Sequence, residues 1–393
     1  MNRAGAMSTT VSDLSSMRLA LRLALRAHGQ TSPNPMVGAV LVRGGRVIGQ
    51  GWHRRAGEPH AEIEALRDAE KRGEKIRGAT LYVTLEPCCT QGRTPPCTDA
   101  IIGAGIRRVV VAATDPNPQH AGRGFQLLGK AGIKVSHGLL ADEATRLNEV
   151  FNHWIVQHTP FVTVKSAMTL DGKIATASGE SKWITGEAAR EEGMRLRAVS
   201  DVILVGVNTV LADDPSLTLR AGESSKFKVQ SSKLRRIVLD SRARTPLKSR
   251  IVADDSAVLT TIVVGPDAPL RRVAALSKRV NVLRCPARRD GRLDLRWLLR
   301  RLGRENVTSL LVEGGGEVNA SFLLGGLAQR VVFFYAPKIL GGRDARRTVA
   351  GDGAQSWAEV IPLSQVEWKQ VGDDLMMKAK VGEAGSAKVG RIG

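Results

Sequence analysis

The sequence predicts two successive α/β domains, and three observations support this. The chain has 393 residues, more than one ordinary hydrophobic core organises. Short apolar runs typical of strands alternate with helical patterns twice, once before and once after Pro160. Hydrophobic residues make up 42% of the chain, yet no apolar run reaches the roughly 18 residues that a membrane helix needs. We expect one domain over residues 10–157 and a second over 158–385.

The first domain is expected to open with an amphipathic helix. Its apolar face carries Leu14, Met17, Leu21, Ala24 and Leu25, with arginines 18, 22 and 26 on another face. A transit peptide is the alternative interpretation of this Arg- and Ser-rich stretch. The paired glycines 44 and 45 predict a hairpin turn between two strands within residues 39–49. Helices at 60–72, 99–103 and 125–131, strands at 80–85, 108–113 and 133–136, and a turn at 115–118 should follow.

The second domain repeats the alternation. A strand at 161–166 and a helix at 187–198 should precede strands at 201–206, 236–240 and 259–264. Later strands at 309–312 and 331–335 surround a run of three glycines at 314–316, which leads into a helix through Phe322. Residues 222–233 are polar and predict an exposed insertion, and the tail after Val381 is expected to be disordered.

The charge balance favours anionic partners. The chain has 58 basic and 38 acidic residues, a formal net charge of +20. The basic residues are scattered, and two Tyr and seven Phe offer few stacking partners for bases, so phosphorylated small molecules fit better than nucleic acid. A general bias toward Arg in the source organism would explain the charge equally well. Three of the four cysteines lie between positions 88 and 97, which indicates metal binding in a reducing, cytoplasmic compartment.

The strongest motif is an H-x-E sequence followed by Pro-Cys. His60 and Glu62 open a predicted helix, and Cys88 follows a strand. Base deaminases hold zinc with one His and two thiolates, and a glutamate that does not bind the metal carries protons. Gln91 occupies the usual place of the second thiolate, so we assign zinc to His60, Cys88 and Cys97 and proton transfer to Glu62. Cys89 is the competing ligand, and a merely structural role for this histidine and these cysteines is the plain alternative.

A second motif predicts a phosphate cradle. The chain has no G-x-G-x-x-G sequence, so an ordinary Rossmann site is not supported. Residues 310–312 form a predicted strand that leads through Glu313 and three glycines into a helix. Backbone amides without side chains at a helix N-terminus suit a pyrophosphate, although such a run of glycines is also common in simple turns.

Taken together, these motifs resemble the bacterial bifunctional riboflavin biosynthesis family. The resemblance spans residues 15–380 and rests on residues 34–38 (NPMVG), 59–62 (PHAE), 85–88 (LEPC), 92–97 (GRTPPC), 115–118 (DPNP), 121–124 (AGRG), 166–173 (SAMTLDGK), 177–185 (ASGESKWIT) and 212–215 (ADDP). The family usually has Ser-His directly after the first thiolate, whereas this chain has Cys89-Thr90. A histidine contact to substrate therefore cannot be carried over to position 90.

The resemblance implies folds and contact residues. It implies a cytidine-deaminase-like three-layer domain followed by a dihydrofolate-reductase-like α/β domain. The implied deaminase substrate contacts are Asn34, His53 and Arg93. The implied cofactor contacts are Ala167, Trp183, Thr209, Asp213, Ser241, Gly315, Gly316, Glu317, Val318, Asn319, Ala320 and Ser321. The implied reductase substrate contacts are Lys165, Ser181, Arg197, Leu217, Arg220 and Glu313, of which the two arginines suit a ribose phosphate.

The resemblance also implies the reactions. A domain with one zinc ion would deaminate 2,5-diamino-6-(5-phosphoribosylamino)pyrimidin-4(3H)-one, and a second domain would use NADPH to reduce the ribosyl side chain of the product to ribityl. NADPH rather than NADH follows from the resemblance alone. The alternatives are a nucleic-acid base deaminase with an accessory domain and a regulatory protein that kept the fold without the chemistry. We expect no nucleic-acid or membrane partner, and the sequence leaves the oligomeric state open, a homo-oligomer included.

Overall fold

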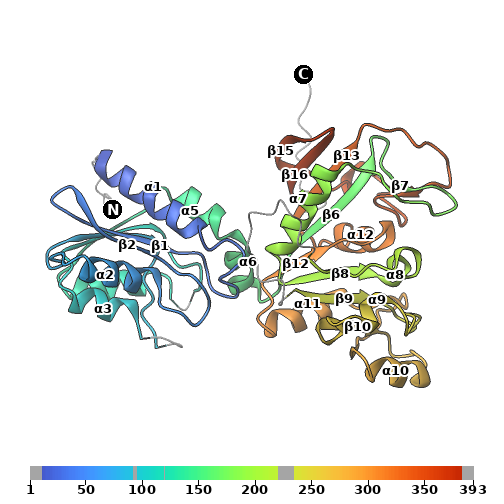
Figure 1. Ribbon diagram of the computed structural model, residues 1–393, viewed down its shortest axis with the longest axis horizontal. Coiled ribbons are helices and arrows are strands. Elements are labelled where there is room, and N and C mark those ends of the chain that lie inside the picture. The colour runs from blue at the N-terminus through green and yellow to red at the C-terminus, as the bar shows by residue number, and fades with distance from the viewer. Residues whose placement is uncertain (1–10, 92–94, 119, 220–233, 383–393) are drawn as a thin grey trace. The chain divides into compact units, whose positions relative to one another are not determined.

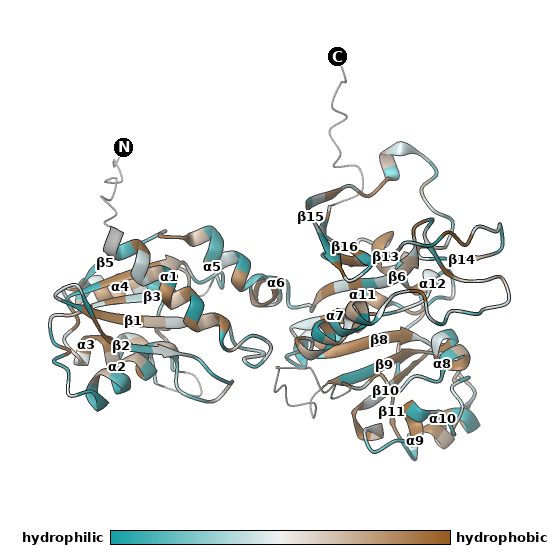
Figure 2. Ribbon diagram, turned by 45° about the horizontal axis from the view of Figure 1, so that its top comes forward, coloured by the Kyte–Doolittle hydropathy of each residue, from teal (hydrophilic) through white to brown (hydrophobic). Residues whose placement is uncertain are grey.

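A computed structural model describes residues 11–91, 95–118, 120–219 and 234–382. The chain divides into two compact units, Met1–His158 and Thr159–Gly393 (Figure 1). Each unit has its own main sheet, and the strands of both main sheets are mainly hydrophobic (Figure 2). No described helix combines the length and the apolar character needed to span a membrane. The predicted insertion at 222–233, Arg93, Arg220 and most of the tail after Val381 lie outside the described residues.

The first unit contains a five-stranded sheet in the order β2-β1-β3-β4-β5. Strands β1 and β2, joined by the predicted Gly44-Gly45 turn, are antiparallel, as are β1 and β3, whereas β3, β4 and β5 are parallel. Both turn glycines have positive φ, as a tight hairpin requires. The strands are β1 Gly38–Arg43, β2 Arg46–Trp52, β3 Thr80–Leu85, β4 Arg108–Ala113 and β5 Lys134–His137. The helices are α1 Val11–Leu25, α2 Ala61–Lys71, α3 Cys97–Gly103, α4 Arg123–Lys130, α5 Ala141–Leu147 and α6 Glu149–Gln157.

Glycines let two helices approach this sheet closely. A Cβ atom on Gly38 would lie 2.0 Å from the Ala20 carbonyl oxygen of α1. One on Gly51 would lie 2.4 Å from the Ala65 backbone nitrogen of α2. Gly51 is paired with Ala39, the neighbour of Gly38, so the two glycines face opposite sides of the pleated sheet. Helices therefore cover both faces, and the first unit has three layers.

The second unit is built on a nine-stranded sheet in the order β11-β10-β9-β8-β12-β6-β13-β16-β15. Strands from β11 to β13 run parallel, and β16 and β15 add an antiparallel edge. A separate pair joins β7 to β14. The strands are β6 Phe161–Thr169, β7 Lys173–Ala175, β8 Val202–Gly206, β9 Arg235–Leu239, β10 Thr260–Val264, β11 Asn281–Arg284, β12 Ser309–Val312, β13 Arg330–Ala336, β14 Arg346–Arg347, β15 Leu363–Val371 and β16 Asp374–Val381.

Helices connect most of the parallel strands of this unit. They are α7 Glu187–Ala198, α8 Val207–Asp213, α9 Arg250–Ala253, α10 Leu270–Ser277, α11 Leu295–Arg304 and α12 Gly316–Leu323, with 3-10 turns η2 Ala257–Leu259 and η3 Trp357–Glu359. Parallel strands need such crossovers, and ligands of α/β sheets bind beyond the carboxyl ends of the strands. Glycine 314, which links β12 to α12, and Ser241, which follows β9, lie at this edge.

Candidate active sites

Three potential metal ligands meet beside the sheet of the first unit. His60 is the N-cap residue of α2, Cys88 follows β3, and Cys97 begins α3. The His60 Nδ1 atom lies 3.2 Å from the Cys97 Sγ atom and 3.5 Å from the Cys88 Sγ atom. The three ligand atoms all lie within 4.8 Å of one another. Cys89 lies outside this cluster.

The donor set of this cluster fits a zinc ion. Hydrogen bonds from the Cys97 thiol and from His60 lower the pKa of Cys88, so a thiolate is favoured there. The Cys97 backbone N–H also donates to the Cys88 sulfur at 3.3 Å. One imidazole and two sulfur ligands are a combination that zinc prefers, and three protein ligands leave a fourth position for a reacting molecule. The residues therefore suit a catalytic zinc site.

Glu62 lies in the first turn of α2, two residues beyond His60, and its side chain is buried at 3% exposure. Burial, followed by the negative charge of Cys88, raises the pKa of Glu62 to about 7. A carboxyl group with this pKa can accept and release a proton near neutral pH. Glu62 also lines a cavity with His60 and Cys88.

That cavity has a volume of about 230 Å³. The expected substrate residues Asn34 and His53 both line it, and the Asn34 amide lies 3.0 Å from the His53 Nε2 atom. The second ring nitrogen of His53 lies 3.1 Å from the Pro59 carbonyl oxygen, so both nitrogens of this ring have partners. Thr90, which stands where the family usually has histidine, also lines the cavity. Arg93 lies outside the described residues.

Sequence reasoning missed several residues of this cavity. Phe151 and Ile155 come from α6, which was not predicted as a separate helix. Glu86 also lines the cavity; it is buried and lies two residues before Cys88 in the sequence. Asp115, Asn117 and His120, from the predicted turn and the segment that follows it, were also missed, as were the apolar lining residues Pro35, Val37 and Leu85. The 115–118 turn was part of the family pattern and could have indicated that this segment reaches the site.

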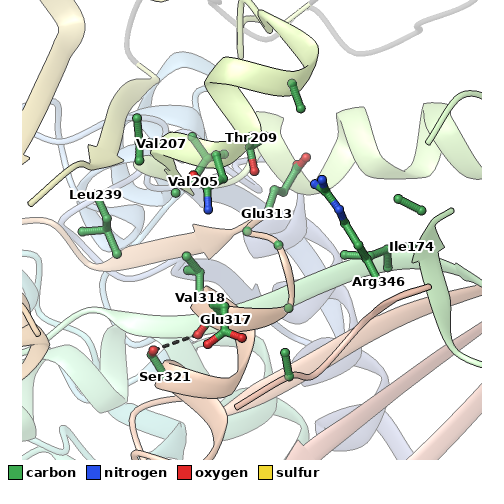
Figure 3. A pocket seen from close by; sticks show the side chains of 18 of the residues that line it. Ile174, Val205, Val207, Thr209, Leu239, Glu313, Glu317, Val318, Ser321 and Arg346 are labelled. Atoms are coloured by element: carbon green, nitrogen blue, oxygen red, sulfur yellow. Dashed lines mark hydrogen bonds between the residues drawn. The ribbon is translucent and has the colours of Figure 1, made fainter. Parts of the chain in front are cut away.

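A larger cavity, of about 1360 Å³, lies in the second unit (Figure 3). Residues at or just after the carboxyl ends of β8, β9 and β12 line it, among them Gly206, Leu239 and Glu313. Nine of the expected cofactor residues line it: Ala167, Thr209, Asp213, Ser241, Gly315, Gly316, Glu317, Val318 and Ser321.

Three expected cofactor residues are not among the lining residues. Trp183 is 64% exposed, and the Arg190 guanidinium lies 4.8 Å from the centre of one of its rings. Asn319 is fully buried and donates to the Thr348 carbonyl oxygen at 2.9 Å, so its side chain holds α12 against a neighbouring segment. Ala320 is buried in the same helix. For these three positions the structure shows no direct access to the cavity.

The three glycines before α12 have different environments. A Cβ atom on Gly314 would lie 2.5 Å from the Val318 Cβ atom, and one on Gly316 would lie 2.3 Å from the Arg347 carbonyl oxygen. At Gly315 nothing lies within 4 Å of such an atom, and the residue is the N-cap of α12. Packing therefore requires glycine at 314 and 316, while position 315 opens onto the cavity. This geometry fits a cofactor phosphate at the helix N-terminus.

Of the expected reductase substrate residues, Lys165, Ser181, Arg197, Leu217 and Glu313 line the cavity, and Arg220 lies outside the described residues. The Arg197 guanidinium donates to both carboxylate oxygens of Glu313, at 2.9 and 2.8 Å. Burial by itself would raise the pKa of Glu313, but the positive charges of Arg197 and then Lys165 lower it to about 2. The Arg197 guanidinium is thus paired with the Glu313 carboxylate. This differs from the expectation that it binds a ribose phosphate.

Comparisons with known proteins agree with this arrangement of sites. A family model for the cytidine and deoxycytidylate deaminase zinc-binding region matches residues 10–113, and one for the RibD C-terminal domain matches residues 160–377. The chain is 43% identical to the riboflavin biosynthesis protein RibD of Actinobacillus pleuropneumoniae over 368 residues, which are 94% of this chain and 95% of that protein. The chain belongs to the RibD family.

Other RibD proteins give the same result. The RibD protein of Escherichia coli K12 is 42% identical, and the match covers 92% of this chain and 97% of that protein. The RibD structure from Acinetobacter baumannii superposes with a TM-score of 0.83 at 36% identity, covering 95% of this chain and 99% of that one. A diaminohydroxyphosphoribosylaminopyrimidine deaminase and 5-amino-6-(5-phosphoribosylamino)uracil reductase from Thermotoga maritima superposes with a TM-score of 0.77 at 34% identity, covering 94% and 99%.

Membership of the RibD family confirms several predictions from the sequence. The chain is a bifunctional enzyme of riboflavin biosynthesis, with a deaminase and a reductase. The expected folds are confirmed as a cytidine-deaminase-like domain followed by a dihydrofolate-reductase-like RibD reductase domain. Zinc and NADPH are the cofactors that these two domains fit.

Proposed function

We propose that the first unit deaminates 2,5-diamino-6-(5-phosphoribosylamino)pyrimidin-4(3H)-one and that the second reduces the ribosyl side chain of the resulting 5-amino-6-(5-phosphoribosylamino)uracil to ribityl. The observation that carries the first step is the convergence of His60, Cys88 and Cys97 with buried Glu62 on one cavity. The name of the Thermotoga protein, whose structure matches 94% of this chain, supports the choice of substrates.

In the proposed deaminase site, His60, Cys88 and Cys97 hold zinc, which when bound acts as a Lewis acid that makes water nucleophilic at neutral pH. Glu62 carries the first proton of the attacking water to the ring nitrogen, and then carries the second, from the hydroxyl group added to the ring, to the amino group that leaves as ammonia. Asn34 and His53 hold one another in place and present polar edges to the pyrimidinone. Arg93 stays a proposed substrate contact on the strength of the family resemblance.

In the proposed reductase site, Gly315 and the start of α12 would hold the pyrophosphate of NADPH, and the bound nucleotide would supply the hydride for reduction of the ribosyl group. Lys165 and Glu313 bind the substrate, and Arg197 holds the Glu313 carboxylate in position through two hydrogen bonds. The Ser181 hydroxyl donates to the Asp213 carboxylate at 3.3 Å, and both residues line the cavity. The remaining cofactor and substrate contacts stay proposed as the resemblance implies them, Trp183, Asn319, Ala320, Leu217 and Arg220 included.

The proposed partners are phosphorylated pyrimidines rather than nucleic acid or membranes, and the proposed domain boundaries are residues 10–157 and 158–385. The cavity linings support small-molecule ligands in both units. Three of the four cysteines, 88, 89 and 97, lie close together in the chain, and two of them are proposed zinc ligands, which supports the proposed reducing, cytoplasmic location. A homo-oligomer is compatible with these proposals and is not required by them.

Replacement of the proposed ligand Cys97 tests the zinc site. Cys97→Ser should lose most of its zinc and its deamination, because a serine hydroxyl is a poor zinc ligand compared with a thiolate. Cys89→Ser is the matched control and should keep both, since Cys89 lies outside the cluster. Metal analysis of the purified variants is the measurement, and reductase activity reports that the chain is folded. Full zinc in Cys97→Ser together with loss of zinc in Cys89→Ser would show that the ligand assignment is wrong.

A further inference from the structure

An asparagine at the junction of α5 and α6 is joined to the segment that carries Asn34. The Asn148 Oδ1 atom accepts a hydrogen bond from the Met36 backbone N–H at 2.8 Å, and the Asn148 Nδ2 atom donates to the Met36 carbonyl oxygen at 2.9 Å. Asn148 is only 3% exposed, and 112 residues of chain separate it from Met36. The side-chain amide thus supplies one acceptor and one donor, as the backbone of a neighbouring strand would.

The side chain of Asn148 does not cap its own helix. Asn148 is the N-cap residue of α6, a position where asparagine commonly accepts a hydrogen bond from a backbone N–H of the first turn. In α6 the side chain makes no such bond. Its buried amide is directed to Met36 instead, so stabilisation of the helix does not account for the contact.

Both partners of this contact belong to walls of the deaminase cavity. On one side, α6 contributes Phe151 and Ile155, which lie four residues apart and therefore on one face of the helix. Asn148 lies three residues before Phe151. On the other side, the segment around Met36 contributes residues 34, 35 and 37 to the lining. The Asn148 amide therefore joins two walls of one cavity.

Two prolines make the position of Asn34 depend on that of Met36. Pro33 and Pro35 flank Asn34 in the sequence. A proline fixes its own φ angle and restricts the residue before it, so the backbone of this segment has few conformations. Bonds that hold Met36 therefore also restrict Asn34, whose side-chain amide lies 3.0 Å from the His53 Nε2 atom in the cavity.

We propose that Asn148 is a positioning residue of the deaminase: by holding the Met36 backbone, it keeps the Asn34 amide where the pyrimidine substrate binds. The proposal rests on the substrate contact of Asn34 given under the proposed function. The zinc ligands and Glu62 come from α2, α3 and the segment after β3. Loss of the Asn148 amide should therefore weaken substrate binding and leave the metal and the proton carrier in place.

Steady-state deamination by the full chain, with the diaminopyrimidinone as substrate, tests this proposal. Asn148→Ala should raise KM by about tenfold and leave kcat within about threefold, because the change loosens a binding contact and spares the reacting groups. The zinc content should stay at the parent value. Hydrogen exchange of the peptide that contains Met36 should speed up by about tenfold, since the Met36 N–H loses its acceptor.

Asn148→Asp is a second variant of the same shape. It keeps the acceptor for the Met36 N–H and loses the donor to the Met36 carbonyl oxygen, so it should also raise KM while zinc stays bound. This variant decides the question if the alanine variant does not fold.

Asn152→Ala is the matched control. The Asn152 amide, one turn further along α6, donates to the Thr145 carbonyl oxygen at 3.2 Å, and Asn152 is not among the cavity-lining residues. Its loss should change neither KM nor the exchange at Met36. A KM for Asn148→Ala within twofold of the parent, or losses of kcat and zinc that accompany the rise in KM, would overturn the positioning role. If the parent does not deaminate this substrate, the proposed function fails, and exchange at Met36 still decides whether Asn148 holds the segment.

Discussion

Glu62 combines deep burial with a position two residues from a proposed zinc ligand. Its side chain is 3% exposed, and burial raises its pKa to about 7. Buried carboxyl groups are uncommon unless they are paired or functional. Glu64 lies two residues further along α2. Its carboxylate forms ion pairs with Arg54 and Arg67, with N–O distances of 3.5 and 3.4 Å. The two glutamates of one helix turn therefore lie in different environments.

Glu62→Gln should retain zinc and lose deamination by more than about 100-fold, because an amide of the same shape cannot carry protons. The deamination rate and the zinc content of the purified variant are the measurements. Reduction of supplied 5-amino-6-(5-phosphoribosylamino)uracil should continue at the parent rate. Glu64→Gln is the matched control and should deaminate normally. A Glu62→Gln rate within tenfold of the parent would rule out the proton-transfer role.

At the scale of single residues, candidate residues for the chemistry could be chosen from the sequence. The side chains that pair with them in the fold could not. His60, Glu62, Cys88 and Cys97 could be chosen because metal and proton-transfer chemistry allows few residue types at few spacings. The pairing of Arg197 with Glu313 could not be predicted, since 116 residues separate them and no local pattern joins them. The same holds for Asn208 and Arg244, which meet only because β8 and β9 are adjacent.

At the scale of elements, Glu86 connects the end of β3 to the segment 115–124. Its carboxylate accepts hydrogen bonds from the backbone N–H groups of Asp115, Gly122 and Gly124, at 3.1, 3.0 and 2.9 Å. A Cβ atom on Gly124 would lie 2.5 Å from the Pro87 carbonyl oxygen, so the segment fits closely against the residue before Cys88. Glu86 thereby positions the cavity wall that contains Asp115 and His120.

Glu86→Ala should loosen this segment, because three backbone donors lose a charged acceptor. Hydrogen exchange measured by mass spectrometry should speed up over residues 115–124 by at least tenfold, and deamination should fall while zinc stays bound. Glu70→Ala, at an exposed position of α2, is the control and should change neither. Unaltered exchange over 115–124 would show that the carboxylate does not hold the segment.

The strands that are easiest to predict from the sequence are the buried, apolar ones. β3, β4, β8 and β12 are buried over most or all of their length, and each was found from its apolar run. β15 was missed because its apolar residues, Leu363, Val366, Trp368 and Val371, do not keep one alternation along the strand. The pair β7 and β14 was missed because two- and three-residue strands give too short a pattern.

At the scale of the whole molecule, each hydrophobic core formed by the described residues consists of residues of one unit. One core runs from Met17 to Ala144, and the other three lie between Val162 and Ala379. The units divide between His158 and Thr159. This point lies next to Pro160, where the alternation of strand and helix patterns restarts in the sequence. Because each core is complete within one unit, damage to one site should leave the other intact.

Gly315→Val tests both the phosphate cradle and this independence. The residue has φ near −72° and nothing within 4 Å of an added Cβ atom, so valine should fold normally and fill only the cavity. We expect the Kd for NADPH to rise at least tenfold, with zinc content and deamination unchanged, and Gly315→Ala to show a smaller increase. Isothermal titration and the deamination assay are the measurements. An unchanged Kd for NADPH would mean that the glycine run is only a turn, and loss of both activities would mean that the two units depend on each other.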